Sequence, residues 1–495
     1  MKYFLFFLFL CIAGSFQISA QNTDIVKGMV VDMDKHTPLP YTNIVVLHKN
    51  RGTVSNEKGL FSLDISELDK SDSLSFQYVG YDTKVVVISE LDSVDTIFLK
   101  EAIINLSEAF VFSDPPDPEV IVKKVLENKK VNYKKRTAIA QTFIRWRNTS
   151  DIQKINLYLK KNSIKELDEE SLKYAAGKIP KHNTSYTDFL VDLYFSSNID
   201  DTLKIDPVKA VSLKQEEITE LEQMAGIFEK LFNDTEENEY WKVKSGILSQ
   251  KLDIDDEDSE QKKDSVSESR ANTIKTEYYN RSIKSRLGYS SMDDKDMWDF
   301  LYHPGRYVFT LVGGAKVNGE DVYIIDFVPK KSGKYIGRVY ISMNTYALIR
   351  ADYGYAEGKV GRDFHLFGVG YTVNHFSGSV FFEKNGNSYD LKYFSQKTGT
   401  GFSVNRTVSL LKKRERFLFD KKLKEIKVKI DFEVTSEESV EVLIFDEKEI
   451  TDEQFAGFKQ KENMKIIYID HFSDDLWKGY PIIEPTKRMR EYKKQ

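Results

Sequence analysis

The chain has few cysteine and histidine residues, the types that cross-link small secreted folds and bind metal ions. Its 495 residues include one cysteine, Cys11, and seven histidines. A single cysteine excludes a disulfide within the chain. Stability therefore has to come from buried apolar cores, and the chain is long enough for two or three of them.

The histidines do not form a metal-binding pattern. None has Glu three residues after it, whereas zinc peptidases need closely spaced His and Glu ligands and a general base. His365 and His375 are the nearest pair beyond the first domain, and we interpret them as ordinary strand residues. There is no Gly-x-Ser-x-Gly nucleophile motif and no Cys–His pair. The Gly-x-Gly at residues 399–401 runs into a strand-like segment rather than a helix, and Gly368 is predicted to mark a bulge within a strand. The sequence thus predicts no catalytic residue, no metal ligand and no cofactor.

The chain also lacks an excess of charge of one sign. Its formal net charge is −5, its sequence pI is about 6.0, and both signs are interspersed. Nucleic acid is therefore not an expected partner. Beyond the N-terminus no apolar run reaches the length of a membrane helix. Aromatic residues make up 13% of the chain, and Tyr and Phe together with Val and Ile favour strands.

The first 20 residues have the pattern of a secretory signal peptide. One early charge, Lys2, precedes an apolar run from Tyr3 to Ala13, and small residues lead up to Gln21. The run is too short to span a bilayer, which needs about 20 residues. A buried N-terminal element is one alternative, and a lipoprotein anchor at Cys11 is another, although the large Leu10 disfavours it. We expect secretion across the inner membrane, with the mature chain in the periplasm or at the periphery of the outer membrane.

Residues 24–112 read as short strands separated by closely spaced turn signals, which is typical of a small β-sandwich. Four motifs within this segment occur in order. They are Gly28-x-Val30, Pro38-Leu39-Pro40-Tyr41-x-Asn43-Ile44, Gly52-Thr53-x-Ser55-Asn56-x-x-Gly59-x-Phe61 and Leu74-x-Phe76-x-Tyr78-x-Gly80-Tyr81.

These motifs resemble the carboxypeptidase-regulatory-like domain found at the start of many Bacteroidetes envelope proteins. The resemblance implies a small sandwich with structural roles for the motif residues; the family name suggests a peptidase, but the scattered histidines argue against one. The family more often has Asp at position 56, and the Asn found here also caps a turn. Gly59 and Gly80 suit turn positions that disfavour a Cβ atom. Three aromatic residues are expected between the sheets: Phe61, Phe76 and Tyr78.

Residues 113–135 predict a proline hinge followed by a helix over about residues 119–130. Further on, the segment from Gln215 to Asp234 predicts an amphipathic helix packed on a sheet. Its apolar stripe comprises Ile218, Leu221, Ala225, Phe228 and Phe232. Residues 249–273 are polar and predict a mobile loop, whose acidic cluster at 253–258 we interpret as solvated rather than as a calcium site.

Residues 136–440 predict a large antiparallel curved sheet, because hairpin signals follow one another from Gly305 onward. Turns are expected at residues 318–319, at Asn344, at Gly378 and at residues 385–387. Three motifs carry a second resemblance: Tyr323-Ile324-Ile325-Asp326-Phe327-x-Pro329, Gly337-x-x-Tyr340-Ile341 and Tyr346-Ala347-Leu348-Ile349-Arg350. They are similar to the lipoprotein-carrier half-barrel of the LolA type. Residues 441–495 are interpreted as a C-terminal extension, and the fold class is mainly β with minor α.

We expect a non-enzymatic envelope binding or assembly protein whose partner is an outer-membrane protein or a lipid. In the first hypothesis the concave side of the sheet holds an apolar ligand under the amphipathic helix, with Ile218, Leu221, Phe228 and Phe232 as lid residues; a filled core is the plain alternative. A second hypothesis is an envelope hydrolase using Asp363 and His365, which alternate onto one face of a strand. The third is a purely structural subunit.

Overall fold

The computed structural model describes most of the chain after the predicted signal peptide. The described residues are 25–49, 51–91, 94–102, 116–164, 167–197, 203–213, 226–227, 230, 232, 234–236, 238–246, 248–252, 273–317, 319–478, 480 and 482–491. The predicted signal peptide, the acidic cluster and three of the four lid residues (Ile218, Leu221 and Phe228) lie outside them.

The N-terminal domain is a β-sandwich of two small sheets, as predicted. One sheet has the order β4-β1-β7 and the other β3-β2-β5-β6. The strands are β1 (Ile25–Asp32), β2 (Asn43–Val46), β3 (Gly52–Val54), β4 (Leu60–Asp64), β5 (Ser73–Gln77), β6 (Lys84–Val87) and β7 (Val94–Leu99), with the short helix η1 (Ile88–Glu90) before β7. Phe61 and Phe76 meet between the sheets with ring centroids 5.4 Å apart. They belong to a core cluster separate from that of the rest of the molecule.

The turn between β3 and β4 explains two of the motif residues. The Asn56 Oδ1 atom accepts hydrogen bonds from the backbone N–H groups of Lys58 and Leu60. Gly59 has φ +73°, and a Cβ there would lie 2.6 Å from the carbonyl oxygen of Val30. The predicted turn-capping role of Asn56 and the need for glycine at position 59 are therefore confirmed.

Two short helices follow the prolines. They are α3 (Pro118–Glu127) and α4 (Lys129–Asn132). The Asp117 side chain caps α3 by accepting from the N–H of Glu119, as short acidic side chains do at this position. Ile121, Val122 and Val125 form its buried stripe and join the core of the second domain.

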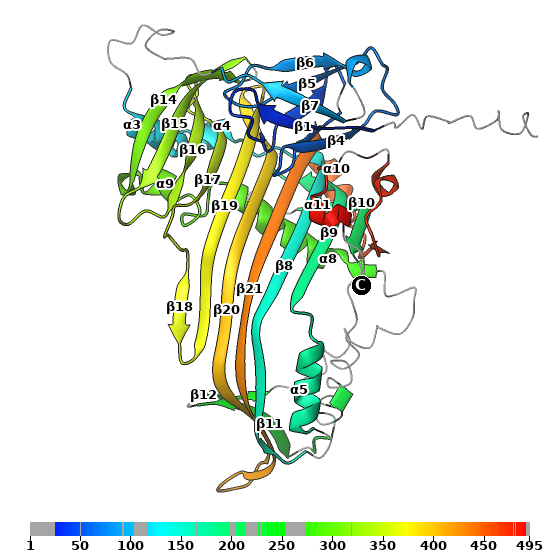
Figure 1. Cartoon of the computed structure of the whole chain (residues 1–495), viewed down its shortest axis with the longest axis vertical. Helices are drawn as coiled ribbons and strands as arrows, with labels where there is room; N and C mark the ends of the chain where they lie inside the picture. The colour runs from blue at the N-terminus through cyan, green and yellow to red at the C-terminus, as the bar shows by residue number, and fades with distance from the viewer. Residues whose placement is uncertain are drawn as a thin grey trace, which may run out of the picture.

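The second domain is built on one curved sheet that is antiparallel except where β23 pairs parallel with β10. Its main order is β14-β15-β16-β17-β19-β20-β21-β8-β9-β10-β23, and β11, β12 and β18 pair off this path. The strands are β8 (Ala138–Asn162), β9 (His182–Phe195), β10 (Lys204–Leu213), β11 (Glu239–Ser245), β12 (Leu248–Leu252), β14 (Tyr307–Val317), β15 (Glu320–Pro329), β16 (Tyr335–Ser342), β17 (Leu348–Tyr355), β18 (Asp363–Leu366), β19 (Val369–Asn385), β20 (Ser388–Arg414), β21 (Lys421–Glu449) and β23 (Ile467–Ile469). β8, β20 and β21 contain 25, 27 and 29 residues and run the length of the molecule (Figure 1).

Two predicted features of this sheet are wrong. β19 does not turn at Gly378, which stays in register with Gln396 and Tyr353. The turn lies instead at Gly368, where a bulge was predicted: Gly368 has φ +74° and joins β18 to β19. An alternating segment does not reveal which glycine turns and which stays extended, because both glycines lie in β-prone sequence.

Helices cover one face of the upper sheet, which we call the helical face. α8 (Thr276–Ser290) places Tyr279 against Trp146 and Phe189, with ring centroids 5.8 and 4.6 Å apart. α9 (Asp299–Tyr302) stacks Phe300 on Phe327 at 4.4 Å. The opposite face, the sandwich face, carries the N-terminal domain.

The remaining elements surround the ends of the sheet. They are α5 (Glu169–Lys178), β13 (Thr273–Lys275), η3 (Pro304–Arg306), α10 (Asp452–Gly457), β22 (Asn463–Lys465), η4 (Asp474–Trp477) and α11 (Lys487–Glu491). At the end far from the sandwich, Leu172 of α5 and Trp241 of β11 form a small third core with Ile426 of β21. Of the helices in the described part of the chain, none has the length and apolar character needed to cross a membrane.

Candidate functional site

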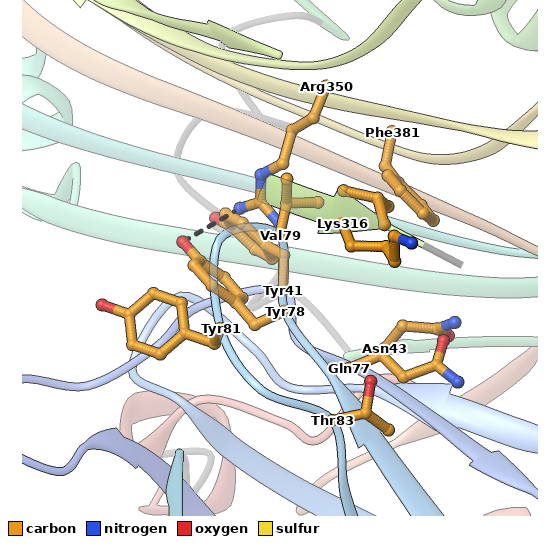
Figure 2. Close-up of a pocket in the computed structure, with 11 residues that line it drawn as sticks. Tyr41, Asn43, Gln77, Tyr78, Val79, Tyr81, Thr83, Lys316, Arg350 and Phe381 are labelled. Atoms are coloured by element: carbon orange, nitrogen blue, oxygen red, sulfur yellow. Dashed lines mark hydrogen bonds between the residues drawn. The ribbon is translucent and has the colours of Figure 1, made fainter. Parts of the chain in front are cut away.

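The sandwich docks on the sheet through the turn between β5 and β6. Figure 2 shows Tyr78 and Val79 pointing from this turn toward Arg350 of β17. The Arg350 Nη2 atom donates to the Tyr78 hydroxyl at 3.2 Å, and the guanidinium lies 4.4 Å from the centre of the ring. Gly80, with φ +86°, brings the turn against Ile324 and Tyr340. Burial raises the pKa of the Tyr78 phenol, so this contact is made by the neutral ring.

A cavity of about 310 Å³ lies beside this turn. Its charged lining residues are already paired: Arg338 binds Asp326 at 2.5 and 2.9 Å, Asp352 is bound by Arg350 at 2.6 Å, and Lys35 binds Glu101 at 3.0 Å. A charged ligand would have to break one of these pairs. We therefore assign this region to docking of the two domains.

A buried ion pair lies deeper under the sandwich. Arg145 of β8 binds Asp188 of β9 through two parallel hydrogen bonds of 2.9 Å. The two side chains are 2% and 0% exposed. Burial acts to lower the pKa of Arg145, but the Asp188 carboxylate outweighs it and raises that pKa. The pair is a fixed, fully desolvated part of the interface.

The C-terminal strap, which we define as residues 482–486, lies between the two domains. From the sandwich, Thr53 donates to the carbonyl oxygen of Ile482 at 2.8 Å, and the Asn56 Nδ2 atom donates to that of Glu484 at 3.1 Å. From the sheet, the Arg145 Nη1 atom donates to the same Glu484 oxygen at 3.1 Å. Asn56 can make this contact because it has an amide; the carboxylate that is more usual at this position cannot donate.

Glu441, which lies near Arg145, provides a pH test of the buried region between the sandwich and the sheet. It is 7% exposed, and burial raises its pKa while Arg145 opposes the shift. The folded state therefore holds a proton that the unfolded state releases above a pKa of about 4.5. Stability conferred by this group is present below that value and is lost as the pH rises through the raised folded-state pKa.

We expect Glu441→Gln to be more stable than the wild type at pH 7 and to approach it near pH 4. Urea unfolding across this pH range measures the difference. A difference between the two proteins that does not change with pH would contradict the assignment.

The middle of the helical face carries an apolar section that belongs to neither adjoining core. Two rows of side chains cross five neighbouring strands at paired positions. One row is Phe364, Tyr371, Phe402, Val434 and Ile152; the other is Leu366, Val369, Val404, Phe432 and Ile155. Neither row contains a polar residue other than the tyrosine. Phe364, Leu366 and Phe402 are 46%, 49% and 38% exposed, and the others are half-buried.

The opposite side of the same strands is polar. Its two matching rows, on the sandwich-face side, are Asp363, Thr372, Gly401, Thr435 and Asp151, and His365, Gly370, Ser403, Glu433 and Lys154. A sheet with one solvated face and one apolar face buries the apolar face against something. In the described part of the chain, α8 covers only the upper neighbours of the apolar section, and the third core covers the lower ones.

Of the four predicted lid residues, only Phe232 is described. Its ring meets Trp241 at 5.3 Å and packs on the third core, next to Leu410 and Val428 of the helical face. It thus lies at the lower border of the apolar section. The lid itself stays a prediction.

The residues of the hydrolase alternative are close together. The Asp363 carboxylate lies 3.0 Å from the His365 Nδ1 atom, and a Cβ at Gly370 would lie 2.7 Å from the His365 Nε2 atom and 2.5 Å from the Ser403 hydroxyl. However, His365 and Asp363 are 66% and 54% exposed, and no hydrogen bond joins His365 to Ser403 among the described residues. Both residues lie on β18, which among the described strands pairs only with β19, so they stand on an exposed edge strand rather than in an enclosed site.

No described group of three or more His, Cys, Asp or Glu side chains is arranged to hold a metal ion.

Comparison with solved structures finds several distant likenesses. The complex of MucA and MucB from Pseudomonas aeruginosa matches with 9% identity, covering 64% of this chain and 93% of that one, at a TM-score of 0.18. A Vibrio parahaemolyticus domain assigned to outer membrane lipoprotein sorting matches with 9% identity, covering 68% and 97%, at 0.20. A DUF1329 family protein from Desulfovibrio piger matches with 12% identity, covering 69% and 98%, at 0.17.

With TM-scores of 0.20 or below, these likenesses support no argument about function. No curated protein matches the chain. Residues 26–111 match the model of the CarboxypepD_reg-like domain, which confirms the resemblance inferred for the N-terminal domain.

Proposed function

We propose that the protein is a non-catalytic cell-envelope protein that holds the hydrocarbon part of a lipid on the apolar section of its helical face. The single observation that carries this proposal is the pair of apolar rows across five strands, half-exposed between two packed cores. The predicted signal peptide and the regulatory-like domain support the envelope as its compartment.

The chemistry of the rows favours a hydrocarbon over other ligands. A peptide or a sugar placed there would leave its polar groups without hydrogen-bond partners, which costs several kcal/mol for each group. An acyl chain has no such groups, and it gains about 25 cal/mol for each Å² of apolar surface removed from water. An outer-membrane protein that docks through this face is the alternative partner.

Phe402→Asp tests the proposal. Because Phe402 is 38% exposed, we expect the fold to survive, while the carboxylate makes the section unfavourable for hydrocarbon. We expect at least about a tenfold loss of affinity for a hydrophobic fluorescent probe, consistent with a desolvation penalty above about 1.4 kcal/mol. Lipid extracted from the purified protein should fall in parallel.

The matched control is Ser403→Asp, which introduces the same charge on the opposite, polar face. It should bind the probe like the wild type. If the wild type carries no lipid and takes up no probe, the proposal fails, and docking of a protein partner or a purely structural role is favoured. Loss of hydrolytic activity on His365→Ala would instead support the hydrolase alternative.

A further inference from the structure

The loop between β20 and β21 presents three large apolar side chains to solvent. Phe417, Leu418 and Phe419 are 102%, 78% and 86% exposed. We call residues 415–420 the hairpin tip. Figure 1 places it at the end of the long strands opposite to the sandwich.

These residues serve neither the turn nor a core. Turns of this kind are usually made by Gly, Asn, Asp, Pro or Ser. Single exposed apolar residues are ordinary, whereas a contiguous exposed group marks an interaction site. The ladder between β20 and β21 is paired up to Arg414 and Lys421, and β11 pairs with β20 up to the same Arg414, so the tip is held at the end of a continuous sheet.

The tip is surrounded by positive charge, although the whole chain has a net charge of −5. Residues 411–425 contain seven Lys or Arg and three Asp or Glu. Arg414 is tied to Glu239 and Glu236 at 2.6 and 2.8 Å, which anchors the base of the hairpin. Arg416 and Lys421, which flank the apolar residues, make no ion pair with the described residues.

We propose that the hairpin tip inserts into the surface of an anionic lipid bilayer. The three apolar side chains would enter the boundary between headgroups and acyl chains, and Arg416 and Lys421 would meet the lipid phosphates, as apolar groups with flanking cations do in membrane-surface binding. This inference does not depend on the proposed lipid-holding function, because it uses a different part of the chain.

Charge and size argue against the other occupants. A second copy of the tip would bring like charges together. Three protruding side chains, at roughly 150–250 Å² for an aromatic residue, provide less contact than the about 800 Å² per partner of a stable protein interface. A bilayer needs no shaped partner surface.

The first test is co-flotation of the full chain with vesicles of phosphatidylethanolamine and phosphatidylglycerol, compared with neutral phosphatidylcholine vesicles. We expect the wild type to prefer the anionic vesicles and the preference to weaken with salt. The triple variant Phe417→Ser, Leu418→Ser, Phe419→Ser should bind at least about tenfold more weakly, because it removes the inserted groups. Since these side chains touch little of the protein, its melting temperature should not change.

Two controls distinguish binding through the hairpin tip from nonspecific adsorption to the vesicles. Replacing the exposed Val308, Val312 and Val328 with serine removes apolar side chains from another surface and should leave binding unchanged. Arg416→Glu with Lys421→Glu should weaken binding by about tenfold or more, since each cation near an anionic surface contributes about a fivefold factor. Lys70→Glu with Lys100→Glu, the same charge change on the sandwich, should have little effect.

Insertion can be measured directly with a fluorophore. With Cys11 replaced by serine, Leu418→Cys provides a single attachment point for an environment-sensitive dye, which should shift to the blue on anionic vesicles. The dye on Lys70→Cys should not shift. The proposal is overturned if the wild type does not float with anionic vesicles, if the triple variant floats equally well, or if the tip instead drives a concentration-dependent dimer. Phe402→Asp should float like the wild type even if the lipid-holding proposal fails.

Discussion

Replacing Asp188 with alanine is expected to lower the free energy of unfolding by about 3–5 kcal/mol, because it leaves the guanidinium of Arg145 buried without its counter-ion. Arg145 is 2% exposed, and its Nε and Nη2 atoms both bind Asp188. Urea unfolding followed by circular dichroism measures the loss.

A surface pair on the next strand provides the control. Asp206 of β10 binds Lys461 at 3.0 Å, and their side chains are 32% and 66% exposed. Asp206→Ala should therefore change stability by less than about 1 kcal/mol. The double variant Arg145→Met, Asp188→Leu should recover most of the loss, since neither member of the pair is then left as an unpaired buried charge. An Asp188→Ala protein within about 1 kcal/mol of the wild type would show that Arg145 reaches water.

The second large effect is expected from Ile483→Asp in the C-terminal strap. Ile483 is fully buried, and its neighbours in the strap are bound by the sandwich on one side and by Arg145 on the other. A carboxylate there costs several kcal/mol if it stays charged. We expect the sandwich to leave the sheet while remaining folded, because it has its own core.

Calorimetry should then resolve two unfolding transitions, and the radius of gyration measured by small-angle scattering should increase. Ile467→Asp, at a position 40% exposed, is the matched control and should do neither. One cooperative transition with unchanged dimensions would mean that the strap does not join the domains. The sandwich expressed as residues 24–112 should also unfold cooperatively without the second domain.

Local patterns were sufficient to predict the sandwich and the type of the large sheet. Gly59 and Asn56 could be assigned to a turn because φ > 0 and side-chain capping are local requirements. The proline hinge and the helix after it were indicated by a change of period.

The features that could not be predicted depend on contacts between distant segments. α8 escaped prediction because it buries only a few residues, among them Tyr279 and Ile283, too few for a clear stripe. The strap lies within the segment interpreted as an extension, although two adjacent isoleucines in a charged tail were a signal. The hairpin tip was also visible as Phe-Leu-Phe between basic residues, but only the structure shows that nothing among the described residues covers it.

The pairing of β8 with β21 has a consequence for how the protein reaches its folded state. Ala138 pairs with Glu449 and Asn162 with Ile426, so each contact between these central strands closes a loop longer than half of the chain. Closing such a loop costs conformational entropy before the contact can stabilise the fold. Folding therefore slows as contact order rises. During synthesis the sheet cannot be completed until β21 has emerged. Until then its long, half-apolar strands have open edges, and aggregation competes with folding.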